Sequence, residues 1–232
     1  MPPAAPIAIT MGDACGIGPE TIARLFRSPQ ASGCFVLGDV GVLRRAVHLT
    51  GGGLVVAEID APPAIDHVPP NALPVLQAQA LPADLIDAPM GTIDARAGAA
   101  AARCIEQAVV LAQRGAVSAL VTAPVHKKAL AAAGVAFPGH TEMLQALATL
   151  PGGQPPKVRM MLANDELRTV LVTIHQSLRS ALDAVTFAAV LDTLRIAHRA
   201  AASWGMATPR IAVAGLNPHA GEGGLFGDEE IT

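Results

Sequence analysis

Aromatic side chains and clusters of basic charge are scarce in this sequence. Its 232 residues include no tyrosine, one tryptophan and five phenylalanines, and the formal net charge is −3. Stacking on nucleic-acid bases needs aromatic faces, and binding to a phosphate backbone needs clustered lysine and arginine. We therefore expect neither nucleic acid nor an anionic membrane surface as a partner.

Long apolar runs and cysteine motifs are also missing. No stretch is long and apolar enough to span a bilayer, and the N-terminus lacks the positively charged region of a secretory signal. The three cysteines, Cys15, Cys34 and Cys104, have no spacing typical of a metal or redox motif. We expect a cytoplasmic protein without a membrane span.

The sequence does contain many apolar segments, since 51% of its residues are hydrophobic. Apolar runs predict strands at 7–10, 34–38, 54–59, 118–125, 158–163, 168–174 and 210–216. Helical spacing and end signals predict helices at 19–28, 41–49, 92–114, 127–135, 140–150, 177–185 and 186–204. The Pro-, Ala- and Asp-rich segment 60–90 predicts loops with one or two short edge strands. This alternation favours an α/β fold with a largely parallel sheet, plus a hairpin turning at Asn164 and Asp165.

Three histidines, His126, His175 and His219, directly follow predicted strands. In open α/β sheets, ligands collect at the carboxyl ends of the strands. Each histidine could simply bond a backbone carbonyl where a loop begins. Taken together, the three favour a metal site built from separated imidazoles, because neutral histidine is the commonest metal ligand.

Two loops are candidates for anion binding. The glycine-rich stretch GDACGIGPE at 12–20 joins a strand to a helix, but it matches neither GxGxxG nor a P-loop, so a tight turn with close packing is the favoured interpretation. The stretch GHTE at 139–142 begins a helix, whose unpaired N–H groups favour an anion. Alternatively, Thr141 is a simple cap and Glu142 a favourable first-turn charge.

Four motifs, in this order, resemble the PdxA family of 4-hydroxythreonine-4-phosphate dehydrogenases: MGDACGIGPE, VTAPVHKKALAAAGVAFPGHTE, VTIHQSLRSAL and GLNPHAGEGGLFGDEEI. The resemblance runs from about Ile7 to the last residue, with Ala14 and Cys15 standing where Pro-Ala is common in the family. It implies two α/β/α domains with the isocitrate and isopropylmalate dehydrogenase fold, a cleft between them, and a homodimer. The implied domains are 1–125, completed by a further C-terminal part, and 126–232, which carries the metal and substrate motifs.

The resemblance also implies a reaction. This is the NAD- or NADP-dependent, divalent-metal-dependent oxidation of the secondary alcohol of 4-phosphooxy-L-threonine to a β-keto acid, which decarboxylates, in pyridoxine and pyridoxal phosphate biosynthesis. Zinc is the preferred ion, with magnesium or cobalt as alternatives. His175 and His219 match two of the family's three metal-binding histidines, and His140 and Thr141 match the pair that contacts the phosphorylated substrate. His126 and Lys127 are candidates for the proton acceptor.

Two alternatives stay open. One keeps the reaction but changes the substrate to D-threonate or D-erythronate 4-phosphate, toward which the MGD of the first loop and the SLR after His175 lean. GHTE disfavours the family's aromatic dihydrodiol branch, because it suits a phosphorylated substrate. The other alternative is a shortened, non-catalytic chain: the family's third metal histidine and much of its nucleotide site follow the NPHAGE motif beyond residue 232, so we expect this chain alone to be nearly inactive.

Overall fold

The structure is a computed structural model, and it describes residues 5–135, 137 and 139–231. These residues form two compact units that meet in the sequence between Pro155 and Pro156. The domain boundary after residue 125 stays a prediction, and the two units are described separately below. No helix within the described ranges is long and apolar enough to cross a membrane.

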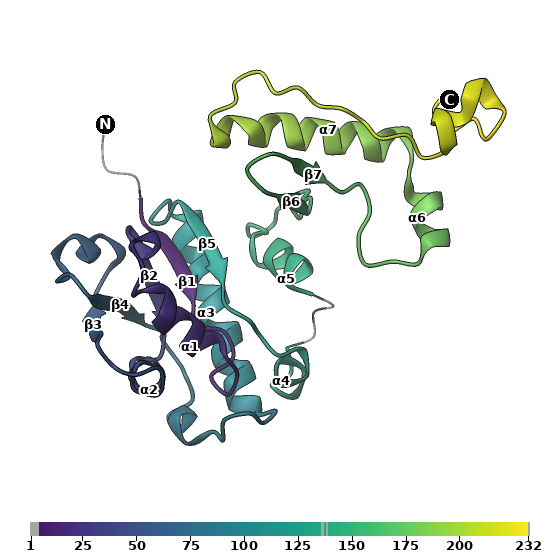
Figure 1. The fold of residues 1–232 in the computed structure, drawn as a ribbon. Coiled ribbons are helices and arrows are strands. Elements are labelled where there is room, and N and C mark those ends of the chain that lie inside the picture. Colours follow the sequence, from purple (N-terminus) through teal and green to yellow (C-terminus); the bar gives the residue numbers. More distant parts are fainter. Residues whose placement is uncertain (1–4, 136, 138, 232) are drawn as a thin grey trace. The chain divides into compact units, whose positions relative to one another are not determined.

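A five-stranded parallel sheet forms the centre of the first unit (Figure 1). Its strands are β1 (Ile7–Thr10), β2 (Cys34–Gly38), β3 (Val55–Ile59), β4 (Ala72–Gln77) and β5 (Ala119–Thr122). They lie in the order β3-β4-β2-β1-β5, and every neighbouring pair is parallel. The predicted α/β class with a parallel sheet is confirmed.

Helices cover both faces of this sheet. They are α1 (Gly18–Leu25), α2 (Val40–Leu49) and α3 (Ala95–Gln113). The connections through α1 and α2 run toward β3, whereas the connection through α3 runs the opposite way, to β5. Because crossovers between parallel strands are right-handed, α1 and α2 lie on one face and α3 on the other (Figure 1).

The strand β4 corrects one prediction. The segment 60–90 was expected to supply only edge strands, yet β4 lies between β3 and β2. Leu73, Pro74 and Val75 are buried in succession, as in a strand that is covered on both faces. Proline is unusual in an inner strand, but the ladder with β2 covers only Val75–Gln77 and so begins just after Pro74.

The long helix α3 is also the support for two shorter helices, α4 (Lys127–Ala132) and α5 (His140–Leu147). A Cβ at Gly98 of α3 would overlap the backbone carbonyl of Ala129 in α4, so the two helices are in backbone contact there. The buried Met143 of α5 packs in one apolar cluster with Ile105 of α3. The first turns of α4 and α5 are therefore both fixed relative to α3.

The second unit contains a small antiparallel sheet and two helices. These are β6 (Met161–Ala163), β7 (Arg168–Val170), α6 (Leu178–Ala184) and α7 (Phe187–Ala201). The side chain of Asn164 accepts hydrogen bonds from the N–H groups of Glu166 and Leu167, which closes the predicted hairpin. Short 3-10 helices complete the two units, at Pro29–Ala31, Pro62–His67, Leu85–Asp87, Ala202–Trp204 and Pro218–Gly224.

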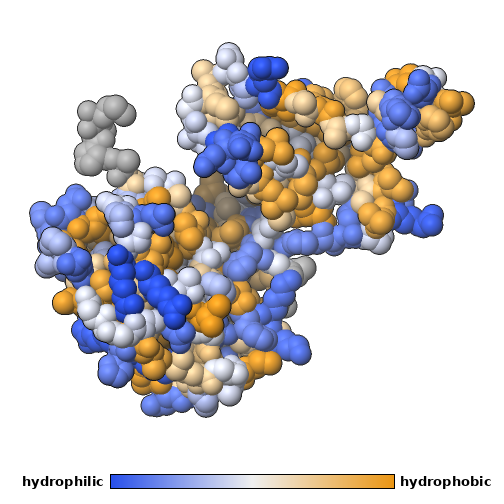
Figure 2. Space-filling model, in the orientation of Figure 1, coloured by the Kyte–Doolittle hydropathy of each residue, from blue (hydrophilic) through white to orange (hydrophobic). Residues whose placement is uncertain are grey.

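The predicted strand at 210–216 is wrong. This segment has no regular structure, and Ile211 and Val213 are 42% and 62% exposed. A strand needs a hydrogen-bonded neighbour, and none pairs with this segment in the part of the chain that the structure describes. Apolar side chains are also exposed elsewhere in the second unit, including Leu178 and Phe187, and orange residues mark its visible surface in Figure 2.

Replacing Gly98 with alanine tests the contact between α3 and α4. Alanine is favoured over glycine inside a helix by roughly 0.5–1 kcal/mol, so propensity alone predicts a stabilised protein. The overlap with a backbone carbonyl predicts the opposite sign, a loss of about 1–3 kcal/mol in the free energy of unfolding. Urea unfolding followed by circular dichroism measures the difference.

The matched control is Gly16→Ala, because the nearest atom to a Cβ there is Cβ of Asp13 at an ordinary 3.4 Å. Its effect should stay within about 0.5 kcal/mol. A Gly98→Ala chain as stable as the Gly16→Ala chain would contradict the close contact.

Candidate functional site

The glycine-rich loop after β1 is closed by backbone contacts. A Cβ at Gly12 would lie 2.5 Å from the carbonyl oxygen of Pro124, and one at Gly18 would lie 2.7 Å from that of Met11. The N–H of Asp13 also donates to Pro124 over 3.0 Å. These glycines allow the ends of β1 and β5 to pack closely. This favours the interpretation of the loop as a tight turn, and not as a phosphate-binding loop.

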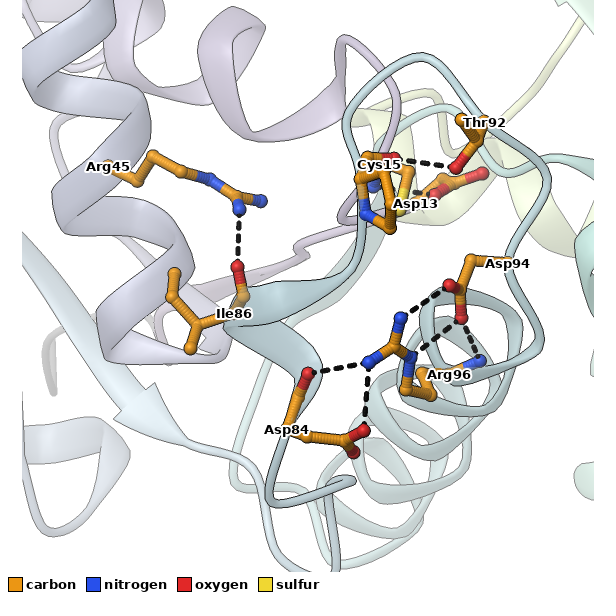
Figure 3. Close-up of polar contacts among 9 residues, drawn as sticks. Asp13, Cys15, Arg45, Asp84, Ile86, Thr92, Asp94 and Arg96 are labelled. Atoms are coloured by element: carbon orange, nitrogen blue, oxygen red, sulfur yellow. Dashed lines mark hydrogen bonds and ion pairs between the residues drawn. The ribbon is translucent and has the colours of Figure 1, made fainter.

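Arg45 links the loop between β4 and α3 to this turn by hydrogen bonds (Figure 3). Its guanidinium donates to the carbonyl oxygens of Ala14 (3.0 Å) and Ile86 (2.8 Å). The N–H of Gly91 donates to the carbonyl of Cys15 over 2.7 Å. The loop between β4 and α3 therefore lies fixed against the first loop.

Arg96 secures the other end of the same loop, at the start of α3. It pairs with Asp94 at 2.7 Å and with Asp84 at 2.8 Å (Figure 3). The hydrogen bonds from Arg96 lower the pKa of Asp94 to about 2. Asp94 also accepts from the backbone N–H of Arg96, as the N-cap of α3.

Cys15 is not a reactive thiol in this arrangement. It is 3% exposed, and burial, followed by the nearby charge of Asp13, raises the pKa of its thiol. A thiol with a raised pKa stays protonated at neutral pH and is a poor nucleophile. The family departure at Ala14 and Cys15 therefore concerns packing.

The substrate motif GHTE lies at the start of α5. Gly139 is the N-cap, and no side chain among the residues that the structure describes caps this end of the helix. His140 and Thr141 occupy the first turn and are half-buried. The unpaired N–H groups and the positive end of the helix dipole make this turn suitable for an anion.

His140 carries a buried polar atom without a partner. Its Nε2 is buried and has no hydrogen-bond partner among the described residues. Burial, and then the charge of Lys127, lowers the pKa of this imidazole. At neutral pH, His140 is therefore a neutral ring close to a fixed positive charge from the first turn of α4.

The predicted metal ligands His175 and His219 share an unusual backbone conformation. Both are exposed, and both have φ of +54°. Residues other than glycine rarely adopt this left-handed region, and where they do, the strain often marks a functional position. The backbone thus sets both histidines apart from the other histidines among the described residues.

The three histidines predicted to follow strands do not follow strands of one sheet. His126 is the N-cap of α4 after β5, in the first unit. His175 follows β7 in the hairpin of the second unit, and the segment before His219 is not a strand. The three histidines therefore do not share the predicted strand-end position.

The resemblance implies a bound divalent metal ion, with His175 and His219 among its ligands. His175 and His219 offer exposed imidazoles, the donor type that zinc prefers. Across the described ranges, however, no group of three or more histidine, cysteine or acidic side chains is close enough to hold an ion. Catalytic zinc sites use three protein ligands, so the donor type of these histidines suits zinc, but the described residues do not supply a full set of ligands.

The acidic residues after the NPHAGE motif were not among the predicted site residues. Glu230 accepts hydrogen bonds from the backbone N–H groups of Leu216 and Asn217, each over 2.7 Å. The only sequence signal was the position of Glu229 and Glu230 at the end of the fourth family motif.

Comparison with known proteins identifies relatives over nearly the whole chain. The family model for pyridoxal phosphate biosynthetic protein PdxA matches residues 30–232. A 4-hydroxythreonine-4-phosphate dehydrogenase of Beijerinckia indica is 47% identical over 97% of this chain, and the chain spans 65% of that relative's length. A D-threonate 4-phosphate dehydrogenase of Salmonella typhimurium is 41% identical over 97% of this chain and 67% of its own length. The crystal structure of a 4-hydroxythreonine-4-phosphate dehydrogenase from Klebsiella pneumoniae superposes with a TM-score of 0.86 at 39% identity, over 99% of this chain and 68% of that one.

The lowered pKa of His140 gives a titration test. We expect its imidazole to titrate below the ordinary value of 6.5 in an NMR pH series. Between this folded pKa and 6.5 the unfolded chain binds more protons, so the contribution of His140 to stability falls as pH falls through that range. Lys127→Ala should raise the midpoint, although burial, the larger cause, keeps it below 6.5.

Lys128→Ala is the matched control, because Lys128 is also exposed on α4 but contributes no shift to His140. Equal midpoints in the wild-type and Lys127→Ala chains would show that Lys127 does not act on His140.

Proposed function

The chain belongs to the PdxA family of pyridoxal phosphate biosynthetic proteins, and we propose that it supplies the substrate-binding and metal-binding part of an NAD- or NADP-dependent dehydrogenase. The proposed substrate is 4-phosphooxy-L-threonine. Its secondary alcohol is oxidised to a ketone, and the resulting β-keto acid decarboxylates. The proposed setting is pyridoxal phosphate biosynthesis in the cytoplasm, by a homodimer.

The first turn of α5 is the observation that carries the proposal for a phosphorylated substrate. Nε2 of His140 is buried without a partner among the described residues, and a buried polar atom of this kind costs about 1–3 kcal/mol unless it is satisfied. A phosphate oxygen would satisfy it, with Thr141 and the N-terminal N–H groups of α5 as further donors. Lys127 adds positive charge near His140.

A bound phosphate would also change the protonation of His140. The dianion would offset the effects of burial and of Lys127, so the imidazole would take up a proton and donate a charge-assisted hydrogen bond. In this role His140 and Thr141 orient the substrate, and neither exchanges a proton with the reacting carbon or its hydroxyl.

The oxidation itself needs groups that the protein would bind. When bound, a divalent ion supplies Lewis-acid polarisation of the hydroxyl, and the nicotinamide supplies the hydride acceptor. His175 and His219 are the residues proposed to hold the ion, with zinc preferred and magnesium or cobalt as alternatives. Their support is the match to the family motifs and the left-handed backbone that they share.

A second candidate keeps the reaction and changes the acid to D-threonate or D-erythronate 4-phosphate. Its support is the 41% identity to a D-threonate 4-phosphate dehydrogenase. Both candidates carry a terminal phosphate, so both fit the first turn of α5. The third candidate, a non-catalytic chain, is supported by the incomplete donor set of the described residues.

Calorimetric titration of the 232-residue chain with 4-phosphooxy-L-threonine tests the substrate class. We expect binding that becomes about 10- to 100-fold weaker in His140→Ala, because a hydrogen bond to a charged group contributes about 1.5–3 kcal/mol. Thr141→Ala should weaken binding less, and D-threonate 4-phosphate in the same titration separates the first two candidates by their affinities.

His67→Ala is the control, since it removes an exposed histidine from the 3-10 helix Pro62–His67. If neither phosphorylated acid binds, the non-catalytic candidate replaces the dehydrogenase.

With NAD or NADP and zinc added, we expect almost no turnover from this chain, and a rapid rate of reduced-nicotinamide formation would refute that expectation.

A further inference from the structure

Glu230 anchors the chain segment that leads into His219. Its Oε1 accepts two backbone hydrogen bonds, from the N–H groups of Leu216 and Asn217, each 2.7 Å long. These contacts join residues 14 and 13 positions apart in the sequence. One carboxylate oxygen thus fixes two successive peptide groups just before Pro218 and His219.

The side chain of Asn217 completes the anchor. Its Nδ2 donates to Oε2 of Glu230 over 3.0 Å and to Oε2 of Glu229 over 2.6 Å. The backbone carbonyl of Asn217 accepts a hydrogen bond over 3.0 Å from the N–H of Ala220, which follows His219 in the sequence. The residues on both sides of His219 are therefore tied to Asn217, and Asn217 is tied to Glu230.

Two glycines pack closely against the side chains of this anchor. A Cβ at Gly221 would lie 3.2 Å from Oε2 of Glu230 and 2.6 Å from the carbonyl oxygen of Gly227. A Cβ at Gly227 would lie 2.5 Å from Oε2 of Glu229 and 2.6 Å from Nδ2 of Asn217. At Gly221 the short distance is to backbone, so the turn leaves no room for a side chain at that position.

The turn itself is strained. His219, Ala220 and Glu222 have φ of +54°, +51° and +45°. A left-handed conformation is unfavourable for residues other than glycine, and such strain persists only where the surrounding structure imposes it. The N–H groups of Leu216 and Asn217 donate to a charged carboxylate oxygen of Glu230, and hydrogen bonds to a charged group are the stronger kind.

We propose that Glu230 is a positioning residue for His219: it holds the strained turn that presents the imidazole for metal binding. This inference rests on the proposed role of His219. Glu230 is not assigned as a ligand, because both of its oxygens already accept hydrogen bonds. The same bonds lower the pKa of its carboxyl, so it stays charged at neutral pH.

The test combines backbone amide exchange with zinc binding in the 232-residue chain. In Glu230→Ala, NMR hydrogen exchange at Leu216 and Asn217 should become about 10-fold faster or more, since each loses a bond to a charged acceptor. Zinc affinity by calorimetry should fall to the level of His219→Ala. In Glu230→Gln, the remaining Oε1 acceptor should restore much of the amide protection.

Glu229→Ala is the matched control, because its carboxylate reaches the side chain of Asn217 and neither backbone N–H group. It should leave exchange at Leu216 and Asn217 near the wild-type rate, with little change in zinc affinity.

Three outcomes would overturn the inference in distinguishable ways. Unchanged exchange in Glu230→Ala shows that Glu230 does not hold the turn. Faster exchange with wild-type zinc affinity, in a chain where His219→Ala lowers that affinity, shows that the turn does not position the imidazole. If His219→Ala binds zinc as well as the wild type, the proposed metal role fails as well, whatever the exchange rates are.

Discussion

The backbone contact between α3 and α4 at Gly98 fixes the helix that begins with Lys127. With no side chain at residue 98, the carbonyl of Ala129 occupies the space that a Cβ would take, and α4 lies directly on α3. Lys127 begins α4, and α5 docks on the same helix through Met143 and Ile105. Two separate contacts, one at Gly98 and one between Met143 and Ile105, thus hold two helix N-termini on one rigid support, which is the arrangement that precise placement of binding groups requires.

Polar groups in the first unit differ in whether the described residues satisfy their hydrogen bonds. Arg45 and Arg96 donate to named carbonyls and carboxylates, so the first loop and the loop after β4 are internally satisfied. The buried Nε2 of His140 lacks such a partner among the described residues. Oγ1 of Thr10, at the end of β1, is also buried without a partner there. Because an unsatisfied buried group is costly, the free Nε2 of His140 supports the proposal that a ligand binds at α5.

Local patterns in the sequence predict the fold better than they predict the site. Alternating strands and helices identified the parallel sheet, but the composition of segment 60–90 hid β4, whose inner position is set by pairing with β2 and β3. At 210–216 the apolar pattern was strand-like, yet a strand also needs a neighbour for its hydrogen bonds. The family motifs selected His140, Thr141, His175 and His219. The role of Glu230 could not be read from the sequence, because its contacts span 13 and 14 residues around a left-handed turn.

His175 and His219 were predicted to be positioned by strand ends, but in the structure what they share is a left-handed backbone conformation. Strand ends position side chains through the regular geometry of a sheet, whereas these two histidines lie on loops, in backbone states that are unfavourable on their own. A loop can present a side chain rigidly only if other contacts hold its strain. For His219 those contacts are visible in Glu230, Asn217 and the glycines around them. The NPHAGE motif and the acidic pair that follows it therefore form one structural unit: the first part carries the imidazole, and the second fixes the conformation in which it is carried.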